Sequence, residues 1–204
     1  MPKIISSKIV SGLLWVATVL VVGIGGYFAG WSAEAKLEDV NTRNAPLTPE
    51  VRLEEQGRYD EAIQVVLDKR EKEGLPEADT DWQVSLIYLE RAKKDVANRE
   101  RWAQQAASYL DKAVALAPQD IFILQNAMDG FDRVGDYSEN GCPDYEKSVS
   151  FGEAAIGLLQ GSTIRIRGIS GNDRIQPTQP IRDVIQPQLK KVGAKLAAWC
   201  RKTS

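Results

Sequence analysis

The chain has 204 residues, with 28 acidic and 26 basic side chains, no histidine and a formal net charge of −2. The lack of histidine excludes Ser-His-Asp and Cys-His catalysis, histidine–zinc sites and histidine ligation of haem. The two cysteines form no CxxC pair, which also excludes zinc ribbons and thioredoxin motifs. We therefore expect no catalytic residue, no metal site and no cofactor.

The N-terminal part predicts a membrane anchor. A short flank, residues 1–8, precedes an uncharged, proline-free apolar run over residues 9–31. As a helix these 23 residues span about 34 Å, enough to cross a hydrocarbon core about 30 Å thick. The alternative is a signal peptide cleaved near the small residues of 33–35, but the run is longer than the roughly 7–15 apolar residues typical of one. We expect an uncleaved single-pass transmembrane helix.

The basic residues around this run predict its orientation. Lys3 and Lys8 precede it together with the amino terminus, whereas Lys36 and Arg43 follow it. The positive-inside rule then favours a cytoplasmic N-terminus. The rest of the chain is expected on the outer side, periplasmic or lumenal, and we expect the membrane to be the inner membrane of a bacterium.

Small residues gather in the outer half of the apolar run, and they predict a helix–helix contact. Two pairs have small-xxx-small spacing, which lets a partner helix approach closely in a membrane. The residues of this glycine face are Gly23, Gly25, Gly26, Ala29 and Gly30.

A polar linker, residues 32–47, leads to a domain over residues 48–160 whose pattern is helical throughout. Thr48 and Pro49 predict a helix start, and a second helix is predicted over 60–73 with Gly74 as its end. The run from Thr80 to Gln83 predicts a capping box that opens a third helix. Residues 92–101 continue that helix or form a loop. Further helices are predicted from Trp102 to Leu116, over 120–134 with its end at residue 135, and over 145–159.

Three segments resemble the tetratricopeptide (TPR) family of helical repeats. The stretch 57–62, Gly-Arg-Tyr-Asp-Glu-Ala, is similar to the turn between the two helices of such a repeat. The stretch 108–120, SYLDKAVALAPQD, has the spacing of a second helix, and Gly135-Asp136-Tyr137 again looks like the turn. The repeats are degenerate, because the middle unit is too long and SENGCPD interrupts the third. The resemblance implies an all-α stack of antiparallel helix pairs whose concave face binds a peptide or another protein.

Charge is unevenly distributed along the chain. Residues 33–160 hold 26 acidic and 15 basic side chains, whereas residues 161–204 hold 2 acidic and 9 basic. Residues 161–180 predict a small hairpin or a loop ordered by a partner, and their basic cluster is Arg165, Arg167 and Arg174. The cluster either pairs with the acidic body or docks on lipid phosphate or on carboxylates of a partner.

Residues 181–204 predict a C-terminal helix that starts properly at Pro187, because proline does not fit a regular helix interior. Its expected buried face, which caps the stack, is Leu189, Val192, Leu196 and Trp199.

The two cysteines allow one disulfide. Cys142 falls in the predicted loop before the last repeat helix, and Cys200 in the C-terminal helix. Outside the cytoplasm the two would pair, and the alternative is two unpaired thiols.

These features predict a membrane-anchored, non-catalytic scaffold or accessory subunit of a multi-subunit membrane complex, with membrane-embedded and soluble protein partners. One alternative is a membrane-tethered chaperone for translocating or unfolded chains. Another is an enzyme that uses the carboxylate pairs Glu54/Glu55 or Asp129/Asp132, although such spacing is more typical of a solvated helix face. The acidic body disfavours nucleic acid as a partner.

Overall fold

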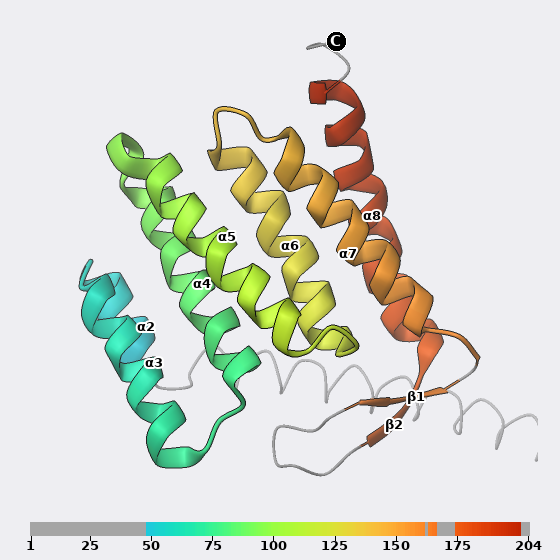
Figure 1. Cartoon of the computed structure of the whole chain (residues 1–204), viewed down its shortest axis with the longest axis horizontal. Coiled ribbons are helices and arrows are strands. Elements are labelled where there is room, and N and C mark those ends of the chain that lie inside the picture. Colours follow the sequence, from blue (N-terminus) through green and yellow to red (C-terminus); the bar gives the residue numbers. More distant parts are fainter. Residues whose placement is uncertain (1–47, 162, 167–173, 201–204) are drawn as a thin grey trace, which may run out of the picture. The chain divides into compact units, whose positions relative to one another are not determined.

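A computed structural model describes residues 48–161, 163–166 and 174–200 (Figure 1). The chain divides into two units, residues 1–47 and 48–204, and the description concerns the second. The predicted transmembrane helix, its glycine face, the linker and Arg167 therefore lie outside the described residues. Within the described ranges, every helix is too short or too polar to cross a membrane.

Seven α-helices and one short two-stranded sheet make up the described part. The helices are α2 (Pro49–Glu55), α3 (Tyr59–Glu73), α4 (Glu77–Lys94), α5 (Arg99–Leu116), α6 (Ile121–Tyr137), α7 (Cys142–Leu158) and α8 (Thr178–Cys200), with a 3-10 turn, η1 (Val96–Asn98), between α4 and α5. The strands are β1 (Thr163–Ile166) and β2 (Arg174–Pro177). The predicted helical body is confirmed, and the sheet is its one departure from an all-α fold in this part of the chain.

Consecutive helices pack as pairs, α2 with α3, α4 with α5 and α6 with α7, and α8 packs on α7 (Figure 1). The even-numbered helices also contact one another, α4 most extensively with α6. By contrast, α3 and α5 barely meet. The layer of odd-numbered helices is therefore splayed, and a groove lined by α3, α4 and α5 is left between α3 and α5.

The core follows this arrangement. One cluster lies between α4, α5 and α6, with Leu89, Leu110 and Phe131 buried at its centre. A second joins α3 to α4, and a third joins α6, α7 and α8 around Met128 and Ile185. Each helix pair thus shares its apolar surface with the next pair, as expected for a stack.

Two of the predicted turns are confirmed by backbone geometry. Gly57 separates α2 from α3 with φ of 75°, and Gly74 ends α3 with φ of 66°. Glycine is suited to both positions, since other residues rarely adopt positive φ.

The predicted start of the third helix at Thr80 is wrong. α4 begins at Glu77, after Pro76, and Thr80 lies inside its first turns. The Thr80 hydroxyl donates to the carbonyl oxygen of Pro76 at 3.1 Å, and its side chain is fully buried. A threonine that bonds back along the helix fills an interior position rather than a cap.

The predicted helix end and turn at Gly135 are also wrong. α6 continues to Tyr137, and the connection to α7 falls at residues 138–141. Gly135 is needed for packing, because a Cβ atom there would lie 2.6 Å from Cε1 of Tyr145. The glycine lets the tyrosine ring of α7 press against the backbone of α6.

Residues 163–166 and 174–177 pair as two strands, as the hairpin alternative predicts. The strands pair antiparallel, from Thr163 opposite Pro177 to Ile166 opposite Arg174. α8 follows at once, with the Thr178 hydroxyl donating to the carbonyl oxygen of Gly161 at 2.7 Å.

The predicted start of the last helix at Pro187 is wrong, because α8 runs through it from Thr178. Pro187 is exposed, while Ile185 before it is buried against α6 and α7 and Val192 after it is also buried. This burial outweighs the hydrogen bond that the proline removes. Of the predicted buried face, Val192 is buried and Trp199 is 61% exposed.

A disulfide joins Cys142, the first residue of α7, to Cys200, the last of α8, with Cα atoms 5.6 Å apart. Cys142 is therefore helical and not in the loop.

Lys195 attaches α8 to α6. Its ammonium group donates to Asp132 at 2.6 Å and to Asp136 at 2.8 Å. Although burial lowers the pKa of Lys195, these bonds raise it overall, so the ammonium stays charged.

Candidate functional site

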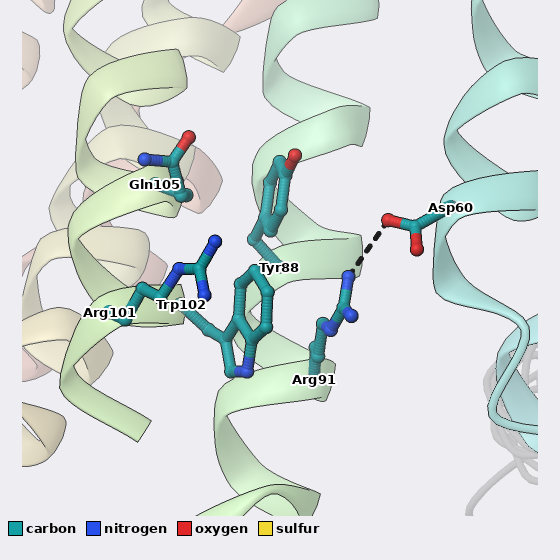
Figure 2. A pocket seen from close by; sticks show the side chains of 6 residues that line it. All are labelled: Asp60, Tyr88, Arg91, Arg101, Trp102 and Gln105. Carbon is teal, nitrogen blue, oxygen red and sulfur yellow. Dashed lines mark hydrogen bonds and ion pairs between the residues drawn. The ribbon is translucent and has the colours of Figure 1, made fainter. Parts of the chain in front are cut away.

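The groove between α3 and α5 contains a pocket of about 560 Å³ (Figure 2). Three helices supply its walls. The lining residues are Asp60 from α3, Tyr88 and Arg91 from α4, and Arg101, Trp102 and Gln105 from α5. All six lie in the described part of the chain.

Helical spacing brings these side chains together. Tyr88 and Arg91 are three residues apart on α4, as are Trp102 and Gln105 on α5, so each pair shares one face of its helix. Asp60 is the second residue of α3. The pocket exists because the stacking of two helix pairs places these three faces around one space.

Arg91 is held on two sides. Its guanidinium donates to the carboxylate of Asp60 at 2.9 Å and lies 3.6 Å from the ring centroid of Trp102 (Figure 2). The side chain is only 20% exposed. Arg91 therefore connects α3 to α5 across α4, and it has little freedom left.

Trp102 is fixed from its edge. Its indole N–H donates to the carboxylate of Asp95 at 2.9 Å, and Asn98 donates to the same carboxylate. These hydrogen bonds, that of Trp102 first, hold the pKa of Asp95 below its usual value. Asp95 is thus ionised at neutral pH and serves to position the indole.

A row of aromatic rings continues from the pocket. Tyr88 stacks on Trp102 with centroids 6.2 Å apart and on Tyr109 at 5.7 Å, and Lys112 lies 4.5 Å from the ring centroid of Tyr109. Burial, followed by the neighbouring Tyr109 and Asp60, raises the pKa of the Tyr88 phenol. The phenol is neutral at physiological pH and keeps its proton for donation.

Arg101 differs from Arg91. It is exposed and its guanidinium carbon lies 4.7 Å from the Trp102 centroid, and in Figure 2 the indole stands between the two arginines. Among the described residues no carboxylate forms an ion pair with Arg101. The pocket thus offers N–H and O–H donors from Arg101, Gln105 and Tyr88 to a bound acceptor.

The arginines of the predicted docking cluster that lie in the strands do not pair with each other across the sheet. Arg165 of β1 is opposite Ile175, and Arg174 of β2 is opposite Ile166. Arg167 lies outside the described residues. The structure therefore tests neither the arm nor its docking role.

Neither carboxylate pair lines the pocket. Asp132 is buried and bound to Lys195. Glu54 is half-buried, and burial followed by the charge of Glu90 raises its pKa. The part of the chain that the structure describes contains no group of His, Cys, Asp or Glu side chains suited to holding a metal ion.

The pocket was not predicted, because Trp102 and Tyr109 fit the apolar pattern of α5, which is typical of core positions. In the structure both are half-buried, Trp102 lines the pocket, and Tyr109 packs against the cluster between α3 and α4. The available signal was the mixture of arginine and aromatic residues at helical spacing in 88–105. No family model, curated protein or solved structure matches the chain, so a function can be proposed only from the sequence and from this geometry.

Proposed function

We propose that this chain is a membrane-anchored, non-catalytic scaffold or accessory subunit that assembles or stabilises a multi-subunit membrane complex. In this proposal the apolar run 9–31 crosses the membrane, and its glycine face packs on a membrane-embedded subunit. The stacked helix pairs, which we take to be degenerate TPR-like repeats, hold a soluble protein segment. Nucleic acid is not among the proposed partners.

The observation that carries the proposal is the pocket between α3 and α5. Arginine, tyrosine and tryptophan are the residues most enriched in the energetic centres of protein interfaces, and here they occur together in a recess. Arg91 and Trp102 are already fixed by Asp60 and Asp95. A partner would therefore lose little side-chain freedom of the pocket on binding, which favours affinity.

The disulfide supports the proposed location of the domain. Structural disulfides persist in the periplasm and in the lumen of the secretory pathway, and they are rare in the cytosol. A bond between Cys142 and Cys200 is consistent with the helical domain on the outer side of the membrane.

Co-purification of the tagged full chain in a mild detergent tests the proposal. We expect one partner complex at fixed stoichiometry. A matched variant, in which residues 9–31 are replaced by an unrelated apolar helix of equal length, should reach the membrane but lose the membrane-embedded partner. A chain that purifies without any partner would contradict the proposal, and many substoichiometric clients would favour the chaperone alternative.

A further inference from the structure

The residues that line the pocket between α3 and α5 limit which chemical groups it can bind. This limit allows us to infer the chemistry of its occupant. The inference rests on the proposed function, because it concerns the protein segment that the scaffold would hold. The ring faces, the charges and the hydrogen-bond donors of the pocket each restrict the chemistry of that segment.

The ring faces are already occupied. Trp102 has Arg91 at 3.6 Å and Arg101 at 4.7 Å from its centroid, and Tyr88 is stacked between Trp102 and Tyr109. Lys112 lies over the ring of Tyr109. A cationic side chain of a partner would need a free aromatic face, and it would meet two guanidinium groups instead.

The charges of the lining residues favour an anion. Arg91 is neutralised by its ion pair with Asp60, and the Asp95 carboxylate accepts hydrogen bonds from Trp102 and Asn98. Arg101 remains as a cation that no described carboxylate neutralises. The acidic character of residues 33–160 opposes an acidic partner at long range, but salt screens exposed charges beyond about 8 Å at physiological ionic strength.

The donors fit a carboxylate. Arg101 presents a planar fork of N–H groups that matches the two oxygens of a carboxylate, and Gln105 and Tyr88 can each add a donor. The Arg101 guanidinium carbon lies 4.7 Å from the Trp102 ring centroid, and this cation–π contact keeps the group beside the pocket before binding.

We propose that this pocket binds a glutamate or aspartate side chain of a partner polypeptide, with the carboxylate on Arg101 and its aliphatic stem in the recess beside Trp102. The site lies in the splayed layer of α3 and α5, whereas the TPR resemblance predicts binding on the concave face of the stack. The partner segment would therefore run along the groove between two helix pairs.

Peptide binding to the full chain in phosphatidylcholine nanodiscs tests this assignment. The probes are short fluorescein-labelled peptides that share the same apolar residues and carry glutamate, glutamine or lysine at the same positions. Fluorescence anisotropy should show that the glutamate peptide binds at least about tenfold more tightly than the other two. Equal affinities for the three peptides would overturn the proposal.

Substitutions at Arg101 test whether this residue causes the preference for the glutamate peptide. Arg101→Gln should weaken the glutamate peptide about tenfold and leave the glutamine peptide unchanged, while Arg101→Lys should keep part of the affinity. The matched control is Lys72→Gln, which changes the net charge equally at an exposed residue about 18 Å along α3 from Asp60. If Arg101→Gln and Lys72→Gln weaken the affinity for the glutamate peptide equally, the net charge of the protein explains the effect and the assignment is overturned.

Phosphate competition and co-purification complete the test. Displacement of the glutamate peptide by millimolar inorganic phosphate would assign the pocket to phosphate groups and overturn the carboxylate proposal. If the partner complex co-purifies equally well with the Arg101→Gln chain, the scaffold function stands and the inference is wrong. If the glutamate peptide binds selectively but no partner co-purifies, the inference stands and the scaffold function fails.

Discussion

Gly135 provides a sharp test of how α6 and α7 pack. We predict that Gly135→Ala destabilises the protein, although alanine is a better helix former than glycine. A Cβ atom at residue 135 would lie 2.6, 2.8 and 2.9 Å from three ring atoms of Tyr145. The ring cannot retreat easily, because Tyr145 is 1% exposed and its hydroxyl donates to Asp136 at 2.7 Å.

Two opposing effects determine how much Gly135→Ala changes the free energy of unfolding. Overpacking of a filled core costs about 1–3 kcal/mol, while replacing a helical glycine by alanine recovers up to about 1 kcal/mol. We expect a net loss of about 1–2 kcal/mol in the free energy of unfolding. Gly157→Ala is the matched control, since Gly157 lies near the end of α7 and nothing is within 4 Å of its added Cβ. That variant should gain about 0.5–1 kcal/mol.

Urea unfolding of the full chain in detergent, followed by far-ultraviolet circular dichroism, measures both variants. The two variants should deviate from the parent in opposite directions and should differ from each other by about 1.5–3 kcal/mol. If Gly135→Ala is as stable as Gly157→Ala, Gly135 does not serve as a packing contact, and a turn at Gly135 would again be the better interpretation.

Three other predictions concern the disulfide, an acidic side chain and the pocket. Replacing Cys142 and Cys200 together by serine should lower the free energy of unfolding by about 4 kcal/mol in the chain-entropy model, given their separation of 58 residues; an unchanged urea midpoint would contradict this. Burial raises the pKa of Glu54, so its charge destabilises the fold at pH 7. This penalty begins to fade as the pH falls through the raised pKa and is gone below the pKa of the unfolded chain. Glu54→Gln should therefore be more stable than the parent at pH 7, with an advantage that is lost on acidification; an advantage independent of pH would exclude this cause. Gln105→Trp should fill the pocket and release the partner in co-purification, whereas Gln104→Trp, at an exposed neighbouring residue outside the pocket, should retain it; equal retention would argue against the pocket.

Local signals predicted much of the helical body. Proline at the start of α2 and glycine with positive φ at residues 57 and 74 act within a few residues of themselves. Such signals are readable in a sequence because their physical cause is local.

The errors arose where distant residues determine the outcome. Gly135 has the composition of a turn, but Tyr145 makes it a packing residue. Pro187 has the composition of a helix start, but burial of Ile185 and Val192 carries α8 through it. Both outcomes depend on contacts between helices, and the spacing of residues along one helix does not show such contacts.

The pocket was beyond prediction for the same reason. Its residues come from three helices, and the spacing on α4 or α5 alone does not show that Asp60 of α3 faces them. An apolar pattern also does not distinguish a tryptophan in the core from one in the wall of a groove. The disulfide was one of two alternatives until the structure placed the ends of α7 and α8 together.

The central claim, that this chain holds one protein partner at the α3–α5 pocket, is tested most directly by photocrosslinking in living cells. A benzophenone amino acid is placed at residue 105, inside the pocket, or at residue 104, outside it, in the full chain. We predict one prominent crosslinked protein from residue 105, through a segment that contains glutamate or aspartate, and a much weaker product from residue 104. No crosslink at residue 105, or the same diverse products from both positions, would contradict the claim.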